Sequence, residues 1–577
     1  MEQRWGLPLV AWPLRLRPNL WDVVALPLVL GLLALIAWGG VAVSAHYQVG
    51  QPLTISLDPW ALPQYAARTV LRMAWALVAS LVFSLAYAAL AAKSRQAEKI
   101  LIPLLDVLQS VPILGFLSIT VTGFIALFPG RLLGVECAAI FAIFTSQAWN
   151  MTFSIYQSLR TVPAELIEAA RMYHLSPWRR FWRLEVPHAV PSLVWNMMMS
   201  VSGGWFFVVA SEAITVAGHT IVLPGVGSYI SVAIEKENLP AIGWAVLVMF
   251  IVILLYDQLL FRPLIAWSRK FQPETSPEED TVRPWFLIMV QRARLFELVQ
   301  AGLLALNRWL DQSFAKIGQA RPARPQRRPR PALDRLYDVA ILGLALAAGA
   351  WLVVYIQAHV SGSEIGWVFV LGLITAVRVL VLIAIASIIW VPIGVAIGLR
   401  PRLADRVQPI VQFLAAFPAN LFFPPVVLLI MRFHLDPEIW LSPLMILGTQ
   451  WYILFNVIGG AAALPAELRR AAQNLGVRRT LWWRRVMLPA IFPAYVTGAV
   501  TAAGGSWNAS IVAEVAQWGN TVLTATGIGA YIAHTTATGD SARIALGIGV
   551  LCIYVLAFNR LLWRRLYNLA AERLRLD

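Results

Sequence analysis

Twelve stretches of roughly 20 or more apolar residues dominate the sequence, and each is long enough to cross a bilayer as a helix. Backbone groups within hydrocarbon must be hydrogen-bonded inside the protein, so such stretches fold as helices. We therefore predict an all-α polytopic membrane protein. The spans lie near residues 22–44, 66–92, 101–128, 134–157, 188–217, 242–267, 336–358, 366–398, 408–431, 437–460, 488–513 and 542–563.

The composition agrees with a membrane location. Hydrophobic residues make up 59% of the chain and charged residues 13%, whereas soluble domains have about 45–50% and about 25%. The net charge of +16 comes from basic residues in loops between apolar spans, which argues against a nucleic-acid partner. Cys137 and Cys552 each lie in an apolar span, so we expect core residues rather than disulfides or metal ligands.

The loop charges predict the orientation of the chain. With a cytoplasmic N-terminus, all but seven of the 46 lysines and arginines lie on the cytoplasmic side, and the C-terminus is cytoplasmic too. The seven exceptions are Arg68, Arg72, Arg131, Lys236, Arg378, Arg432 and Arg543. No small-residue cleavage pattern closely follows the first span, which we expect to be retained as a helix rather than removed as a signal peptide.

The sequence repeats itself at an offset of 302 residues. The stretch VPAELIEAARMYHLSPWRRFWRLEVP begins at Val162, and LPAELRRAAQNLGVRRTLWWRRVMLP begins at Leu464. Each half holds six spans, and an even number makes the two repeats parallel. We predict repeats at 1–267 and 336–577, joined by a cytoplasmic linker at 268–335.

The linker has an unusual composition. It contains the acidic stretch PETSPEED and the basic, proline-rich tract RPARPQRRPRP, neither of which is typical of a packed core. Between them, PWFLIMVQRARLFELVQAGLLALNRWL mixes apolar residues with arginines. This pattern predicts an amphipathic helix on the inner leaflet rather than a thirteenth span.

The repeated polar stretches predict two short cytoplasmic helices, near 163–176 and 465–478. A proline suits the first turn of each helix, and an early glutamate favours the positive end of the helix dipole. Pairs of alanines offer a small surface to a soluble partner, and Gly476 permits a sharp turn after the second helix. These helices are therefore candidates for docking.

The same residues resemble a known motif. Glu168-Ala169-Ala170, with Leu184 and Val186-Pro187 downstream, is similar to the cytoplasmic loop of permease subunits in binding-protein-dependent ABC importers. The second copy has Arg470-Ala471-Ala472 and Gly476. Each copy departs once from that family's pattern, because His174 replaces glycine and Arg470 replaces glutamate. In both copies a Gly-x-Trp, a glutamate and a Gly-x-Gly-x-Tyr follow, which resembles permeases of the nitrate, taurine, aliphatic sulfonate and bicarbonate class.

This resemblance implies a type I ABC importer permease-like fold, here with two permease domains fused in tandem. It further implies transport of a small solute such as nitrate, a sulfonate or bicarbonate across a bacterial inner membrane. The expected partners are two ABC ATPase subunits and a periplasmic or surface solute-binding protein. Since the chain has no Walker-type GxxxxGK[ST], ATP and magnesium would be bound by those subunits, and we expect no cofactor in this chain. The implied coupling residues are Glu165, Glu168, Ala169, Ala170, His174, Glu467, Arg470, Ala471, Ala472 and Gly476.

A second set of residues is a candidate translocation path. Small residues in the fifth helices permit close approach where the halves meet, and the tryptophans either pack there or contact ligand. The glutamates either end a helix near the outer headgroups or line the path. The arginines either snorkel outward or make the outer mouth positive for anions. The set comprises Gly203, Gly204, Trp205, Glu212, Gly505, Ser506, Trp507, Asn508, Glu514, Arg72 and Arg378.

Two other functions remain open at this point. A self-contained secondary transporter with parallel repeats would need a charge relay at mid-membrane, and the sequence offers little beyond Asp257 near a helix end. A membrane enzyme would need clustered catalytic or metal-binding residues, yet the seven histidines are scattered and form no HExxH motif, so we expect neither catalytic nor metal-ligating residues. A copurifying ATPase would separate an importer from both.

Overall fold

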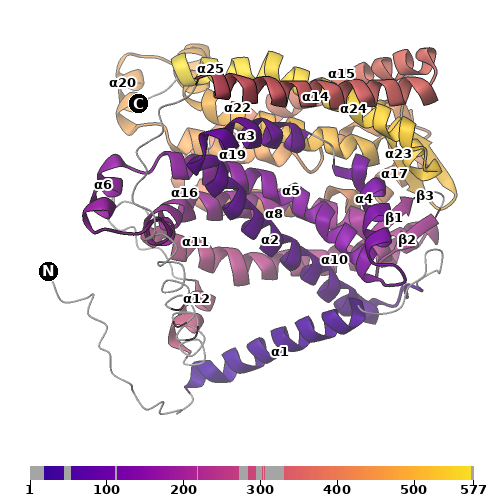
Figure 1. Cartoon of the computed structure of the whole chain (residues 1–577), viewed down its shortest axis with the longest axis horizontal. Coiled ribbons are helices and arrows are strands. Elements are labelled where there is room, and N and C mark those ends of the chain that lie inside the picture. Colours follow the sequence, from indigo (N-terminus) through magenta and orange to yellow (C-terminus); the bar gives the residue numbers. More distant parts are fainter. Residues whose placement is uncertain are drawn as a thin grey trace.

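The structure is a computed structural model that describes residues 19–43, 54–110, 113–216, 219–271, 284–293, 302, 305, 309 and 331–573. The described residues are predominantly helical, and two short β-hairpins are the main exception. Many of the long helices run lengthwise through the molecule, from α6 and α20 at the left of Figure 1 to the hairpins at its right. This arrangement confirms the predicted all-α polytopic architecture.

The first half contains one arrangement of helices with a hairpin near its end. Its elements are α1 (Leu20–Val43), η1 (Pro59–Ala61), α2 (Leu62–Lys93), α3 (Arg95–Ser110), α4 (Ile113–Leu127), α5 (Leu133–Arg160), α6 (Ala164–Met172), α7 (Pro177–Arg180), η2 (Phe181–Glu185), α8 (Val186–Glu212), β1 (Ala213–Val216), β2 (His219–Val222), α9 (Val226–Glu235), α10 (Leu239–Tyr256), η3 (Asp257–Phe261), α11 (Arg262–Ser268) and η4 (Arg269–Phe271).

The second half follows the linker helix α12 (Trp285–Arg292). Its elements are α14 (Pro331–His359), α15 (Gly362–Gly398), α16 (Pro401–Ala416), η5 (Ala419–Phe422), α17 (Phe423–Arg432), α18 (Pro437–Trp440), η6 (Ser442–Met445), α19 (Gln450–Ala462), α20 (Ala466–Asn474), α21 (Arg479–Trp482), η7 (Trp483–Met487), α22 (Leu488–Ala513), β3 (Val515–Trp518), β4 (Thr521–Thr524), α23 (Ile528–Thr538), α24 (Ser541–Phe558), η8 (Asn559–Trp563) and α25 (Arg564–Arg573).

The two halves repeat the same packing. α5 packs against α2 and α8 in the first half, and α19 packs against α15 and α22 in the second. Even the π-helical turns recur at the offset of 302 residues, since η2 corresponds to η7 and η3 to η8. The repeat seen in the sequence is therefore a repeat of the fold.

Not every predicted span is one helix. In the described chain, eight single helices are long and apolar enough to cross a membrane, and two bent pairs bring the number to ten. The predicted spans near 101–128, 408–431 and 437–460 are each divided between shorter helices. The span near 134–157 is α5, which has 28 residues and buries polar side chains such as Gln147 and Thr152 inside the bundle. A helix that faces protein needs less apolar surface than one that faces lipid.

Proline explains the breaks in the second half. Pro418 has no N–H and forces the preceding Phe417 into extended backbone with ψ of 128°, so α16 ends there. The pair formed by α16 and α17 is bent by 78°. The second break lies between Met445 and Gln450, just after the short η6 that contains Pro443, and the bend before α19 is 45°.

The hairpins are a feature that the sequence analysis missed. The predicted span near 188–217 instead ends at Glu212, and the chain turns into β1 and β2, with Ile214 opposite Ile221. The second hairpin follows Glu514 in the same way. In both halves the residue after the hairpin donates its backbone N–H to the carbonyl of that glutamate, at 2.8 and 2.9 Å.

Two helices face outward from the bundle. In Figure 1, α1 runs along the lower edge and α14 along the upper edge. Few or none of the residues in their apolar windows are buried, which is the pattern of a helix surrounded by lipid. Of the linker at 268–335, the described parts include η4 and α12, whereas the acidic and proline-rich stretches lie outside the described residues.

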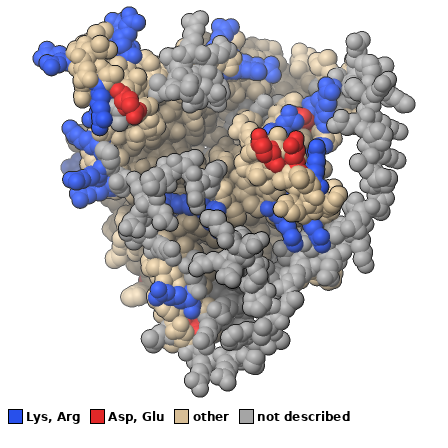
Figure 2. Space-filling view, turned by 90° about the vertical axis from the view of Figure 1, so that its left-hand side faces the viewer, with Lys and Arg blue, Asp and Glu red and all other residues tan. Residues whose placement is uncertain are grey.

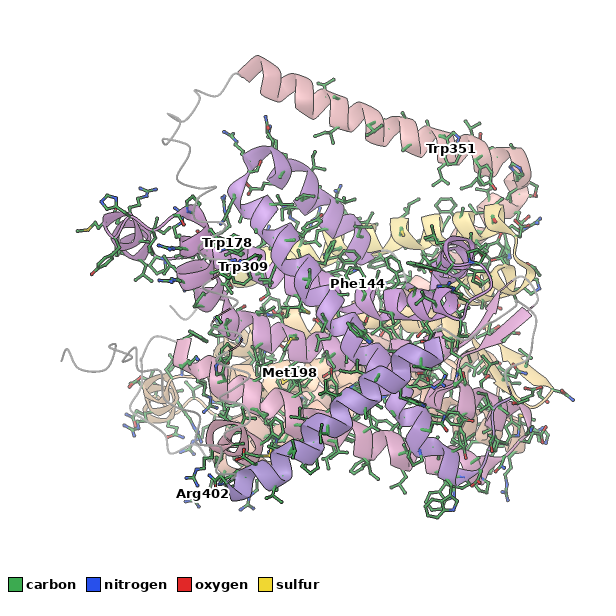
Figure 3. All side chains as sticks on the ribbon, turned by 60° about the horizontal axis from the view of Figure 1, so that its bottom comes forward. Phe144, Trp178, Met198, Trp309, Trp351 and Arg402 are labelled. Carbon is green, nitrogen blue, oxygen red and sulfur yellow. The ribbon has the colours of Figure 1, made fainter. Side chains whose placement is uncertain are left out.

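The two halves contact each other through several helices. α16 of the second half packs on α8, and α4 of the first half packs on α22 and α24. Gln412 donates to the sulfur of Met198 at 2.7 Å, and the rings of Trp195 and Phe455 stack with centroids 5.6 Å apart. Met198 lies inside the bundle in Figure 3, close to the middle of the molecule.

Candidate functional site

The two short helices predicted for docking are α6 and α20, which lie on the same face of the molecule (Figure 1). Pro163 and Pro465 precede them with nearly identical backbone angles, and an exposed glutamate lies in the first turn of each helix. Figure 2 shows this face, where lysines and arginines outnumber the acidic residues. Glu165, Glu168, Glu467 and Arg470 are all exposed on it.

Both helices end in the same hydrogen-bonded turn. His174 and Gly476 follow the last helical turn with positive φ angles of 49° and 68°. In α6 the N–H groups of His174 and Leu175 donate to Arg171 and Ala170, and α20 repeats these bonds. This is the Schellman arrangement, which satisfies the last carbonyls of a helix. The interpretation of His174 as a turn residue in the place of glycine is confirmed.

The backbone of both His174 and Gly476 is in the left-handed conformation, which costs a residue with a side chain about 1–2 kcal/mol but costs glycine little. We expect His174→Gly to raise the thermal stability of the purified protein slightly while leaving transport unchanged. No atom lies near a Cβ built at Gly476, so Gly476→His is expected to lower the stability by a similar amount without a steric clash. Differential scanning fluorimetry of both variants measures this, and a transport defect in His174→Gly would contradict a purely conformational role.

The exposed face of each helix carries large apolar side chains. Met172 and Tyr173 are each 80% exposed, and Leu475, at the position equivalent to Tyr173, is also 80% exposed. Leu166 and its equivalent Leu468 are partly exposed as well. Apolar side chains left in water at the same place in both repeats indicate a surface that binds another protein.

The alanines play a different part from the one predicted. Ala170 and Ala472 are 6% and 5% exposed, so they pack against their own chain and do not face a partner. Ala169 is half-buried, and Ala471 is exposed. A Trp substitution at Ala170 or Ala472 would therefore not test docking through a clash with a partner. A tryptophan at either position would first disrupt the packing of the short helix against the rest of its own chain.

The two docking segments are connected to the bundle by different chemistry. In the first half Glu185 accepts from Arg180 at 2.8 Å and lies 3.0 Å from Lys93, which ends α2. The equivalent positions in the second half hold Met487, Trp482 and Leu399. An ionic connection in one repeat is thus replaced by an apolar one in the other. We therefore expect the two segments to contribute unequally to any coupling with a partner.

The small residues of the fifth helices lie at close contacts, but only one of those measured faces the other half. A Cβ built at Gly203 would be 3.4 Å from the hydroxyl of Tyr452, which belongs to the second half. Gly204 instead faces Gln147, and Gly505 faces Thr449, each within its own half. Ser506 is buried and lies 3.0 Å from the Thr449 hydroxyl.

The two tryptophans pack inside their own repeats. Trp205 is 1% exposed and meets the ring of Tyr256, and Trp507 meets the equivalent Phe558. Asn508, the residue after Trp507, joins the halves, because its side-chain oxygen accepts from the backbone N–H of Ile113 at 2.8 Å. A role for these residues beside a translocation path remains a prediction.

Arg72 lies in a buried ion network. Its guanidinium donates to both oxygens of Glu136 at 2.6 and 2.7 Å, to Glu212 at 2.6 Å and to the carbonyl of Pro224 at 2.9 Å. Arg72, Glu136 and Glu212 are 2%, 4% and 0% exposed. The expected outward snorkelling of Arg72 is therefore wrong, since its donors are directed at these carboxylates. Contact with a transported anion remains a prediction.

Thr69 and the backbone before α9 complete this network. The Thr69 hydroxyl donates to Glu212 at 2.7 Å and accepts from the N–H of Val226. The N–H of Gly227 donates to the other oxygen of Glu212 at 2.7 Å. A Cβ at Gly225 would overlap the Glu212 carboxylate, and one at Gly227 would overlap the carbonyl of Val209. The first glycines of the Gly-x-Gly-x-Tyr motif thus let the backbone close over the buried charge.

The second half contains the same network in a more open form. Arg378 donates to Glu438 at 3.1 Å and to Glu514 at 3.0 Å, and Thr375 donates to Glu514 at 2.8 Å. Glu514 is 1% exposed, but the Glu438 side chain is 45% exposed. Glu438 also accepts from the N–H and the hydroxyl of Thr526. The two networks have the same members but differ in their access to water.

Sequence reasoning identified only half of each network. It found Arg72, Arg378, Glu212 and Glu514 but missed the two threonines and the carboxylates contributed by α5 and by α18. A signal for them was present, because Glu136 and Glu438 are 302 residues apart, the same offset as Glu212 and Glu514. The residues missed were Thr69, Thr375, Glu136 and Glu438.

These contacts also explain several basic residues predicted on the outer side. Arg72 and Arg378 are neutralised by carboxylates, and Arg543 pairs with Glu364 and Asp540 at 2.7 and 2.6 Å. The bond from the Arg543 backbone N–H helps to hold the pKa of the Asp540 carboxyl below its usual value. An arginine paired with a carboxylate presents little net positive charge. Such residues on the outer side are therefore compatible with the excess of positive charge on the predicted cytoplasmic side.

Two parallel helical repeats, each carrying an exposed short helix between its fourth and fifth predicted spans, define a multi-pass membrane transport component. The chain belongs to the family described as binding-protein-dependent transport system inner membrane component, whose model matches residues 80–262 and 388–568, together more than half of its length. One match lies in each repeat, which confirms that two permease domains are fused in tandem.

Individual relatives match shorter parts of the chain. The bicarbonate transport system permease protein CmpB of Synechococcus elongatus is 30% identical over 136 residues, which cover 24% of this chain and 48% of the relative. The nitrate import permease protein NrtB of Leptolyngbya laminosa is 28% identical over 184 residues, covering 32% and 62%. The glycine betaine/proline betaine permease protein ProW of Escherichia coli is 29% identical over 204 residues, covering 35% and 54%. The chain thus spans about half to three fifths of the length of these relatives.

Proposed function

We propose that this chain forms the whole membrane-spanning permease of an ABC importer and that separate ATPase subunits bind α6 and α20. The observation that carries the proposal is the recurrence of one exposed, Schellman-terminated helix in each repeat on the same face (Figure 1). Each helix offers a strongly exposed apolar residue, Tyr173 or Leu475, beside charged ones. Two such surfaces fit two copies of a soluble partner.

The proposed substrate is a small anion such as nitrate, bicarbonate or a sulfonate. The relatives CmpB and NrtB are named for bicarbonate and nitrate transport, which supports this class. ProW is named for betaines, which are zwitterions, so uptake of a betaine is the competing outcome. A solute-binding protein would deliver the substrate at the opposite side, where the two hairpins, α9 and α23 lie in Figure 1.

The proposed mechanism moves the two halves relative to each other. ATP and magnesium, bound by the partner subunits, would supply the free energy, and closure of those subunits would push on α6 and α20. ATP binding would then shift the population between inward-open and outward-open forms of the permease. This chain would supply the path and the docking surfaces but no catalytic residue.

The decisive experiment is reconstitution in proteoliposomes with the cognate ATPase and binding protein. We expect uptake of the labelled substrate to require ATP on the α6–α20 side and binding protein on the other. Uptake that follows an ion gradient without ATP would overturn the proposal and favour a secondary transporter. Ligand identification on the purified binding protein would name the substrate.

The orientation can be tested with single cysteines and a membrane-impermeant thiol reagent. Ser228 is unsuitable as a labelling site, because it is 0% exposed and its hydroxyl donates to the Glu212 carbonyl. Lys236 and Arg171 are exposed at opposite sides of the molecule. In cells with the outer membrane permeabilised, we expect Lys236→Cys to be labelled and Arg171→Cys to be labelled only after lysis. The reverse result would invert the orientation.

A further inference from the structure

A cavity of about 1370 Å³ lies between the two halves. Its walls come from α8, α10, α11 and α12 of the first half and linker, and from α16 of the second half. Aromatic residues from four of these elements line it, namely Trp205, Phe250, Phe413 and Trp285. A cavity of this size with mainly apolar walls suits a long apolar ligand better than a small ion.

Basic residues collect at one end of this cavity. Arg262, Arg269 and Lys270 line it where the long helix that begins at Leu239 ends. Arg262 pairs with Asp257 at 3.0 Å. Within the described part of the chain, neither Arg269 nor Lys270 is paired with a carboxylate, and both are exposed. The Lys270 ammonium lies 4.4 and 4.8 Å from the ring centroids of Trp267 and Phe271, contacts that hold it at the cavity mouth.

A second pair of basic residues lies on the facing helix α16. Arg402 and Arg406 lie two turns and one turn before Ile410 on α16, so they share the helix face of Ile410 and Phe413, which line the cavity. Arg402 is at the edge of the molecule in Figure 3. The cavity therefore has apolar walls within the bundle and a cationic mouth at Arg269 and Lys270.

The dimensions agree with one leaflet of a bilayer. From Leu254 to Ile265 the helix rises roughly 17 Å at about 1.5 Å per residue, and Lys270 lies roughly a turn beyond. The hydrocarbon core is about 30 Å thick, so one leaflet occupies about 15 Å, followed by the headgroups. Acyl chains along the apolar walls would thus place a phosphate beside Arg269 and Lys270.

We propose that this cavity is a binding site for an anionic phospholipid, with its acyl chains between α8, α10 and α16 and its phosphate at Arg269 and Lys270. Basic pockets between membrane helices are the places where anionic headgroups bind. The equivalent positions in the second half are Ala571 and Glu572, so the site belongs to the first half alone. It does not depend on the transported substrate or on the proposed ATPase partners.

The test uses a photo-reactive amino acid in the full chain, reconstituted in nanodiscs of phosphatidylcholine with one fifth phosphatidylglycerol. Leu254 lines the cavity, and the matched control Leu247, on the same helix and similarly exposed, does not. We expect lipid crosslinked at Leu254 to be enriched about fivefold or more in phosphatidylglycerol, and lipid at Leu247 to match the bulk composition. R269Q/K270Q should abolish the enrichment, whereas R565Q/R573Q in α25 should not change it.

Bulk composition at both positions, or enrichment that persists in R269Q/K270Q, would overturn the proposal. The acidic stretch that follows Phe271 in the sequence is the competing partner of the two cations. If that stretch occupies them, the charge variant will leave the lipid crosslinks unchanged. Arg269 and Lys270 are exposed, so R269Q/K270Q should fold normally, which size-exclusion chromatography verifies. Because no transport is measured, failure here would leave the proposed importer function untouched.

Discussion

Arg72→Gln is expected to lower the free energy of unfolding by about 3–5 kcal/mol, because it leaves Glu136 and Glu212 buried without their cation. Both carboxylates are almost fully excluded from water. Water therefore cannot stabilise their negative charges in the place of the missing guanidinium. We expect a large fall in the apparent melting temperature of the purified protein and in its abundance in the membrane.

Two control variants make this expectation specific. Arg378→Gln should cost less, about 1.5–3 kcal/mol, because Glu438 is partly solvated and keeps its bonds to Thr526. The triple change R72Q/E136Q/E212Q removes all three charges and should recover much of the loss seen for Arg72→Gln. If Arg72→Gln were fully stable yet inactive in anion uptake, the network would not be structural and the path interpretation would gain support.

Tyr173→Asp combined with Leu475→Asp is expected to weaken binding of the ATPase subunits at least tenfold, since losing a central apolar contact costs about 2 kcal/mol or more. The two side chains are the most exposed apolar groups at equivalent positions of the repeats. The measurement is copurification of the ATPase together with ATP-dependent uptake, each normalised to the amount of folded permease.

The matched control for this variant lies at the other side of the membrane. Trp60 in η1 is 88% exposed, so Trp60→Asp makes a similar change far from α6 and α20 and should leave ATPase binding intact. The two single variants should weaken ATPase binding to different extents. The reason is that the ion pair of Glu185 with Lys93 has no counterpart in the second half, where Met487 occupies the equivalent position. Undiminished binding in the double variant would remove α6 and α20 as docking surfaces.

Some features followed from the sequence because their causes are local. A run of apolar residues predicts a membrane helix wherever it occurs, since the transfer from water to lipid depends on that run alone. α1, α2, α15 and α24 lie where the apolar runs predict them. The docking helices were visible for a similar reason, because the sequence around Pro163 and Pro465 specifies their beginning and Gly476 their end.

Other features depended on which distant residues the fold brings together. Arg72 is 64 residues from Glu136 and 140 from Glu212, and no pattern around any of the three predicts that they form one buried network. The burial of Ala170 and Ala472 likewise follows from how each short helix is seated on its neighbours.

The sequence by itself therefore determined the membrane class, the tandem repeat and the two short exposed helices, since transfer free energy and helix termini are properties of neighbouring residues. Only the tertiary structure decided that Arg72 is neutralised inside the protein instead of facing the outer water. The reason is that a charge is stabilised by whatever surrounds it in space, and those groups come from α5, α8 and the loop before α9.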